Sequence, residues 1–220
     1  KQNDGPLTLN NYRQYPGGAP ANAAVAVAKL GGKAYFAGQV GADDFGDFLQ
    51  QALETYKVDT QFLLRHPSAK TALAFVTLDS QGDRSFSFYR QNSADVLFNA
   101  TQIDEQWFSE QPLFHFCSNT LTENEISQAT KAAVSQAKAQ GCLISFDVNL
   151  RHNLWSSGKA DIVLVNELVA MADIIKFSRD ELDYLAQNQV EDYLANCLNQ
   201  GVSVIVITDG EHPIELCTRQ

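Results

Sequence analysis

The amino-acid sequence predicts an α/β fold built around a mostly parallel β-sheet with helices on both faces. Short, almost continuously apolar segments alternate with segments whose apolar residues recur at helical spacing, and this alternation is typical of parallel sheets. Capping residues or glycines bound most of the helical segments. One stretch, residues 71–90, breaks the alternation and predicts an antiparallel hairpin.

The chain has 220 residues, 45% of them hydrophobic and 19% charged, with a formal net charge of −10. This length suits one large domain, since domains average roughly 150 residues, and the composition excludes disordered and fibrous classes. The acidic balance argues against nucleic-acid partners, which need a basic surface. No apolar run approaches the roughly 18 residues of a membrane span, so a membrane partner is not expected.

The cysteine and histidine patterns argue against a metal-ligand or disulfide framework. No Cys-x-x-Cys pair occurs, and the four cysteines are widely spaced, as expected for small buried hydrophobic residues in a cytoplasmic protein. The four histidines show no metal-ligand spacing. No Gly-x-Ser-x-Gly sequence marks a nucleophile for acyl transfer.

The first part of the chain is expected to combine two helices with a small β layer. Its expected elements are a strand over 7–15, a helix over 21–30 ended by Gly31-Gly32, a strand over 34–40, a helix from Asp43 or Asp44 to about Tyr56, and hairpin strands over 71–78 and 84–90. Because this β layer interrupts an α/β chain, we expect it to form a lid or an edge contact.

The second part is expected to supply most of the parallel sheet. Thr122 with Glu125, and Ser178 with Glu181, have the spacing of a capping box at a helix start. The expected strands cover residues 112–117, 142–148, 173–177 and 202–208. The expected helices cover residues 122–140, 159–171, 178–187 and 191–200.

Neither the Walker sequence nor the Gly-x-Gly-x-x-Gly fingerprint occurs, so the common nucleotide-binding motifs are missing. Gly17 and Gly18 instead precede a predicted helix that carries Asn22. Paired glycines allow a ligand to approach the backbone, and an amide side chain suits sugar hydroxyls. An ordinary tight turn that leads into a helix explains the same residues.

Polar residues follow three of the predicted strands at their carboxyl ends, which is the edge where parallel sheets bind ligands. If extended geometry continues, Asp147, Asn149 and Arg151 point to one side and suit a phosphorylated or polyhydroxyl ligand. Ser178 follows the next strand and Thr208 the one after it. A surface salt bridge, a helix cap and simple turns are the structural alternatives.

Taken together, these segments resemble the PfkB family of sugar kinases, the ribokinase and fructokinase type. Within the family, their amino-acid sequences are most similar to those of bacterial fructokinases. The resemblance covers about Tyr12 to Gly210. It rests on the order and spacing of Gly-Gly-Ala-Pro-Ala-Asn at 17–22, Gly-Gln-Val-Gly-Ala-Asp-Asp-Phe-Gly at 38–46, Phe-Tyr-Arg at 88–90 with Ala94-Asp95, Asp-Val-Asn-Leu-Arg at 147–151, Lys-Phe-Ser at 176–178 with Glu181, and Thr-Asp-Gly at 208–210.

The resemblance implies a single ribokinase-like domain over 1–220, with a three-layer α/β/α core and a β lid at about 7–15 and 71–90. It implies a carbohydrate kinase that uses ATP and Mg²⁺, with a possible monovalent cation such as K⁺. Ser178 stands where the family motif has Asn. The implied site residues are Gly17, Gly18, Asn22, Phe88, Arg90 and Arg151 for the sugar, Asn149, Arg151, Ser178, Thr208 and Gly210 for the nucleotide, and Glu181 for the metal through water.

Two segments of the family pattern are missing from these 220 residues. The Gly-Ala-Gly-Asp motif, which supplies the family's catalytic Asp and its anion-binding amides, does not occur. The family's first strand, with a sugar-binding Asp, is not found ahead of Lys1. We therefore expect a fold that is incomplete at both ends and assign no catalytic residue.

Three functional hypotheses remain open at this stage. The first is an ATP-dependent fructokinase of the cytoplasm, paired as a homodimer through aromatic residues of its lid. The second is a non-catalytic sugar-binding protein on the same fold. The third is a kinase of the same family for 2-keto-3-deoxygluconate or a riboside, because Arg90 and Arg151 could meet a carboxylate.

Overall fold

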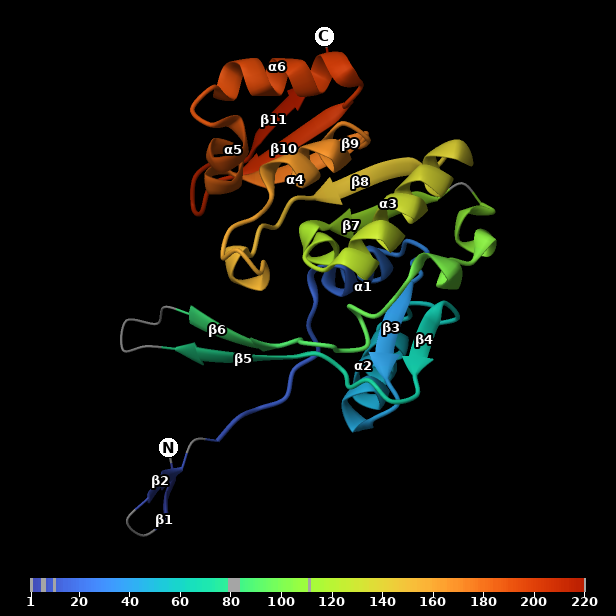
Figure 1. The fold of residues 1–220 in the computed structure, drawn as a ribbon, viewed down its shortest axis with the longest axis vertical. Helices are drawn as coiled ribbons and strands as arrows, with labels where there is room; N and C mark the ends of the chain where they lie inside the picture. Colours follow the sequence, from blue (N-terminus) through green and yellow to red (C-terminus); the bar gives the residue numbers. More distant parts are fainter. Residues whose placement is uncertain (1, 5–6, 10, 79–83, 111, 220) are drawn as a thin grey trace.

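A five-stranded sheet forms the centre of the protein in a computed structural model that describes residues 2–4, 7–9, 11–78, 84–110 and 112–219 (Figure 1). Its strand order is β11-β10-β9-β8-β7. The strands β7 to β10 are parallel to one another, and β11 is antiparallel to β10. This confirms the predicted, mostly parallel sheet. The strands are β7 (Leu113–Cys117), β8 (Leu143–Asp147), β9 (Ile174–Ser178), β10 (Val204–Thr208) and β11 (Glu215–Thr218).

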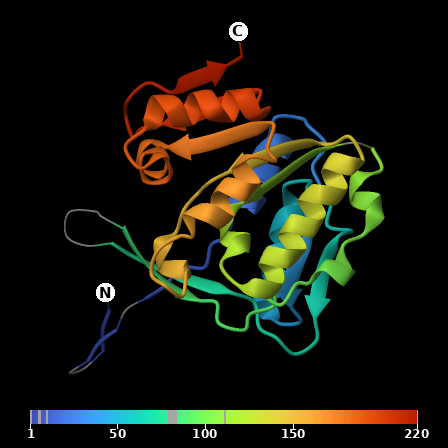
Figure 2. The ribbon, with the colours of Figure 1, turned by 45° about the horizontal axis from the view of Figure 1, so that its top comes forward.

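The helices that connect these strands are α3 (Asn124–Ala139), α4 (Ile162–Val169), α5 (Arg179–Ala186) and α6 (Val190–Gln200). Helices α3 and α4 run alongside each other, joined by Lys131 and Glu167, with α1 behind the strands (Figure 2). Alternate strand residues point into one core because side chains alternate across a strand. In β8, β9 and β10, those exposed by 1% or less are Ile144, Phe146, Ile175, Phe177, Ile205 and Ile207.

The N-terminal part has a smaller core of its own. Helix α1 (Ala19–Lys29) and helix α2 (Asp44–Thr55) pack near β3 (Gly38–Gly41), which pairs in parallel with β4 (Leu63–His66). Asp43 caps α2 as predicted, by accepting a hydrogen bond from the Gly46 amide. The expected strand over 34–40 is shorter, since Tyr35 makes only an isolated bridge, and β4 was not predicted.

The predicted hairpin is confirmed: β5 (Leu73–Leu78) and β6 (Arg84–Tyr89) pair antiparallel and project away from the sheet (Figure 1). The turn expected at 79–83 lies outside the described residues. The expected lid strand over 7–15 is wrong, because β2 (Leu7–Leu9) pairs with β1 (Gln2–Asp4) and residues 11–15 form no strand. The Tyr12 ring nevertheless packs edge-on against Phe75, with centroids 5.2 Å apart.

Short 3₁₀ turns replace parts of the expected helices and loops. Helix α3 begins at Asn124, so Thr122 is not its cap; the Thr122 hydroxyl donates to the Asn119 carbonyl instead. Asp161 caps α4, which therefore begins later than expected. Within the described ranges no helix has both the length and the hydropathy needed to cross a membrane. The 3₁₀ turns are η1 (Ala100–Gln102), η2 (Glu105–Phe108), η3 (Ser118–Leu121) and η4 (His152–Leu154).

Candidate active site

The carboxyl ends of four parallel strands lie next to one another at a single edge of the sheet. Cys117 of β7 pairs with Asp147 of β8, Asp147 pairs with Lys176 of β9, and Ser178 of β9 pairs with Thr208 of β10. Parallel sheets bind ligands at this edge, since the loops and helix starts that follow the strands converge there. The registers therefore bring most of the predicted strand-end residues into one region.

Glu181 is the best-connected side chain of this edge and is only 8% exposed. One carboxylate oxygen accepts a hydrogen bond from the Leu150 amide at 2.8 Å, and the other accepts one from the Ser178 amide at 2.7 Å. The Ser178 hydroxyl in turn accepts from the Glu181 amide, which completes the predicted capping box. Glu181 therefore fastens the loop after β8 to the start of α5.

Lys176 connects the two carboxylates of the site. Its Nζ lies 3.2 Å from Asp147 Oδ1 and 3.8 Å from Glu181 Oε2. A buried carboxylate needs such partners, because an unpaired charge away from water is costly. The sequence motif contained Lys176, but its role as the bridge between the loops after β8 and β9 was not predicted.

Asn149 and Arg151 were expected to share a side with Asp147 if extended geometry continued, and this condition is not met. The strand ends at Asp147, and Asn149 has a φ of 37°, outside the extended region. Asn149 is buried and its carbonyl accepts from the Ser118 hydroxyl at 3.3 Å. Arg151 is exposed and contacts the Leu150 carbonyl. Side-chain alternation cannot pass through a residue of left-handed conformation.

Arg90 joins the lid to the sheet edge. Its Nε donates to Asp95 Oδ2 at 2.6 Å, and one terminal nitrogen donates to the Thr122 hydroxyl at 2.8 Å. Thr122 ends the turn that follows β7, so this contact fastens the end of β6 to the edge. Phe88 is half-buried beside Phe86 on β6.

The thiol of Cys117 is buried at the end of β7, close enough to Asp147 and Arg90 to be affected by their charges. Burial raises the pKa of Cys117 to about 11; the nearby Asp147 charge also raises it, whereas Arg90 lowers it. Both charges therefore act at the end of β7. Since the thiolate is the reactive form, Cys117 is unsuited to act as a nucleophile.

Gly17, Gly18 and Asn22 form the start of α1 rather than part of the network above. Gly18 caps the helix with a φ of 110°, and no side chain caps it. The Asn22 amide donates to the Gly18 carbonyl, and its side chain is exposed. Space is open around Gly17, where an added Cβ would meet nothing within 4 Å. A ligand could thus approach this backbone.

Thr208 and Gly210 complete the edge beyond β10. The Thr208 hydroxyl lies 3.4 Å from the Phe177 carbonyl, to which it donates. Gly210 has a φ of 53° and open space where a side chain would stand. A glycine with open space in place of a side chain allows a ligand to approach its backbone closely.

The donor set fits Mg²⁺ held together with a nucleotide. Magnesium in phosphate-transfer sites binds one or two carboxylates, water and substrate phosphates, rather than a cage of protein ligands. Asp147 and Glu181 are two carboxylates at this edge, and they lie 3.2 Å and 3.8 Å from Lys176 Nζ. Across the described ranges there is no group of three His, Cys, Asp or Glu side chains that could hold a metal ion alone.

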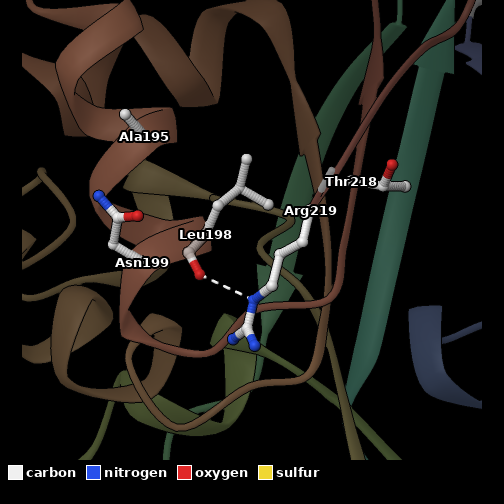
Figure 3. Close-up of a pocket in the computed structure, with 5 residues that line it drawn as sticks. All are labelled: Ala195, Leu198, Asn199, Thr218 and Arg219. Atoms are coloured by element: carbon white, nitrogen blue, oxygen red, sulfur yellow. Dashed lines mark hydrogen bonds between the residues drawn. The ribbon is translucent and has the colours of Figure 1, made fainter.

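A hollow of about 560 Å³ lies elsewhere, between α6 and β11 (Figure 3). Its lining includes Thr218, which pairs with Val204 at the amino end of β10, and Arg219, which donates to the Leu198 carbonyl. The hollow therefore lies at the opposite edge of the sheet from Thr208. We base the candidate site on the strand ends, where the charged and polar groups converge.

Comparison with known proteins agrees with this architecture. Residues 2–220 match the pfkB family carbohydrate kinases. A fructokinase from Vibrio alginolyticus is 39% identical over 206 residues, which are 93% of this chain and 66% of that protein. The chain spans 59–66% of the length of three curated relatives, which is less than two thirds.

Two crystal structures show the same fold. Fructokinase from Xylella fastidiosa with bound ATP is 42% identical, with a TM-score of 0.85 over 92% of this chain and 65% of its own. Fructokinase from Vibrio cholerae O395, with fructose, ADP and calcium ion bound, is 38% identical, with a TM-score of 0.85 over 97% of this chain and 69% of its own. The chain therefore belongs to the pfkB family of carbohydrate kinases.

Proposed function

We propose that this chain belongs to an ATP-dependent sugar kinase whose substrate is fructose. The observation that carries the proposal is the convergence of Arg90, Asn149, Glu181 and Thr208 at one edge of a parallel sheet. Relatives that are named fructokinases, and that bind fructose with ADP or bind ATP, support the choice of ligands. Because the chain is shorter than these relatives, the proposal concerns the activity of the whole protein.

The sugar would bind between the lid and the start of α1. Gly17 and Gly18 offer an accessible backbone, and the exposed amide of Asn22 offers both a donor and an acceptor for hydroxyls. Phe88 and Arg90 belong to the lid side, and Arg151 is exposed in the loop after β8. These residues would supply the donors and acceptors that the hydroxyl groups of a sugar need.

The nucleotide would occupy the neighbouring strand ends. Gly210 provides the open backbone for a phosphate or ribose, and Thr208 provides a hydroxyl. Asn149 and Arg151 would lie between the sugar and the phosphates. Ser178 acts through its capping of α5, which places Glu181.

Magnesium would be held by Asp147 and, through water, by Glu181, together with the ATP phosphates. It would supply positive charge against the oxygens of the transferred phosphate. A monovalent cation such as K⁺ stays a prediction. The chain's own contribution would be positioning: Glu181 holds the Leu150 backbone, and this would keep the neighbouring Arg151 beside the phosphates. Phosphoryl transfer depends mainly on such positioning and on electrostatic stabilisation.

The test is ADP production by the protein as its gene encodes it, with MgATP and a panel of fructose, glucose, 2-keto-3-deoxygluconate and ribosides. We expect turnover with fructose above all other sugars. Sugar binding without ADP production would support the non-catalytic alternative. Neither binding nor turnover with any sugar would reject the proposal.

We further propose that two copies pair through their lids in the cytoplasm, a reducing compartment that suits four free cysteines. Tyr12, Val76, Phe86 and Tyr89 expose 42–66% of their surface on or beside the lid. Light scattering should give twice the protomer mass, and Phe86→Ser should lower it. Phe45→Ser is the matched control, since Phe45 is equally exposed on α2. A monomeric wild type would contradict pairing.

A further inference from the structure

The ion pair between Arg90 and Asp95 neutralises the cation that the lid contributes to the proposed sugar site. Nε of Arg90 and Oδ2 of Asp95 are 2.6 Å apart, and the two side chains are only 15% and 34% exposed. An ion pair that is partly removed from water is screened less than a surface pair. Arg90 thus has a charged partner before any ligand arrives.

Asp95 is held in this position by its own loop. Its second oxygen accepts a hydrogen bond from the Ser93 hydroxyl at 2.5 Å. The loop itself is fixed to the rest of the protein, because the Ala94 amide donates to the Lys70 carbonyl and the Ala94 carbonyl accepts from the buried Gln39 side chain. Asp95 is therefore a carboxylate that the protein already holds in position beside Arg90.

Thr122 holds the other end of the Arg90 guanidinium. A hydroxyl is a neutral acceptor, so it orients Arg90 without changing the charge of the site. Asp95 alone, of the two partners, decides whether Arg90 presents a net positive charge. The other arginine of the proposed sugar site, Arg151, is exposed on the loop after β8, where solvent screens it.

We infer that Asp95 is a specificity-determining residue, which makes the sugar site accept a neutral sugar and reject a sugar acid. This inference rests on the proposed function. A carboxylate on the ligand would have to displace Asp95 from Arg90 or approach it as a like charge, and such contacts in a partly desolvated site are unfavourable. A ketohexose makes neither demand, because its hydroxyls carry no charge.

The variant Asp95→Asn tests the inference, since it removes the charge and keeps both an acceptor for Arg90 and the side-chain shape. The kcat/KM values for fructose and for 2-keto-3-deoxygluconate are measured at saturating MgATP. We expect the ratio of the two to shift toward the sugar acid by about tenfold or more. Glu123→Gln is the control, because it removes an exposed negative charge next to Thr122 and should leave the ratio unchanged.

The same variants are also titrated with both sugars by calorimetry, so that binding is measured without turnover. If the wild type produces no ADP, the proposed function is rejected. The ratio of the two sugar affinities, compared between wild type and Asp95→Asn, would still test the role of Asp95. If the ratio of sugar acid to fructose is the same in Asp95→Asn as in Glu123→Gln, the inference about Asp95 is overturned. The proposed function is unaffected by that outcome as long as the wild type phosphorylates fructose. Where Asp95→Asn does not fold, the wild type decides: preference for fructose supports the inference, and equal use of the acid overturns it.

Discussion

The five-stranded sheet and the lid hairpin are both built from apolar strands, yet different contacts hold them in place. Strands β8, β9 and β10 of the sheet bury alternate residues to 1% exposure or less, whereas Phe86 and Tyr89 of the lid are 42% and 66% exposed. Two polar joints hold the lid instead: Asp43 with Thr71 at its start, and Arg90 with Thr122 at its end. Packing therefore stabilises the sheet, and a few hydrogen bonds orient the lid.

The largest effect is expected inside the sheet. Phe146 is fully buried and stacks on Phe116 with ring centroids 4.5 Å apart. Phe146→Ala should lower the free energy of unfolding by about 3–5 kcal/mol, because it removes apolar contacts and leaves a cavity. Urea unfolding measures the loss, with Phe86→Ala in the lid as control. Equal losses for the two variants would contradict the comparison.

The edge of the sheet should come next. Glu181→Gln removes an acceptor from either Leu150 or Ser178 and places an amide against a backbone donor. The free energy of unfolding should fall by about 2 kcal/mol, since a buried group loses its partner. ATP affinity, measured by titration, should fall as well because the Arg151 loop is released. Asp180→Asn, at an exposed neighbour, should change neither the stability nor the ATP affinity. An equal effect there would contradict the role of Glu181 in fastening the loop after β8 to α5.

The joint at the start of the lid should show a smaller and pH-dependent effect. Asp43 accepts from the amides of Gly46 and Thr71 and from the Thr71 hydroxyl. Burial alone would raise the pKa of Asp43, but these hydrogen bonds and the Lys70 charge outweigh it, so the pKa is lowered from 3.8. Asp43→Ala should cost about 1–2 kcal/mol of unfolding free energy at neutral pH, a typical value for a lost helix cap.

The sign of the pH dependence follows from that lowered pKa. The ionised form is favoured in the folded state, so its stabilisation is complete above pH 3.8 and is lost as the pH falls through the folded-state pKa. The difference between wild type and Asp43→Ala should therefore shrink in acid. Thermal unfolding from pH 7 to pH 3 measures it, with Asp44→Ala as control. A difference that grew in acid would contradict this assignment.

The smallest effect on stability is expected at Gly17, on the lid side of α1. Open space surrounds it and its φ is not positive, so Gly17→Ala should change the free energy of unfolding by less than about 0.5 kcal/mol. Fructose affinity should nevertheless fall by about tenfold if the added methyl group occupies ligand space. Titration calorimetry measures the change. Unaltered affinity would remove Gly17 from the sugar site.

Much of the fold was predictable because its signals are local. Hydrophobic runs marked β7 to β10, Asp43 and Ser178 marked helix starts, and the hairpin followed from its turn residues. The errors occurred where local signals compete. Thr122 has the spacing of a helix cap, but Arg90, 32 residues away in sequence, takes its hydroxyl as an acceptor.

The candidate site was predictable as a set of residues, but not as a set of contacts. Motif spacing identified Arg90, Asn149 and Glu181. It could not show that Asn149 leaves extended geometry, that Glu181 clamps Leu150, or that Asp95 neutralises Arg90. Only the last of these had a sequence signal, the acidic residue five positions after Arg90.

Residue type and local spacing were therefore sufficient for the α/β class, for the starts of α2 and α5, and for the chemistry of the side chains available. The tertiary structure decided which of those side chains meet, because strand register brings together residues that are 30 or more positions apart. Thr208 stands beside Ser178, and Leu150 meets Glu181, through pairings that no local pattern encodes. Burial also sets what a side chain needs, since the buried carboxylate of Glu181 is stable there only because the Leu150 and Ser178 amides donate to it.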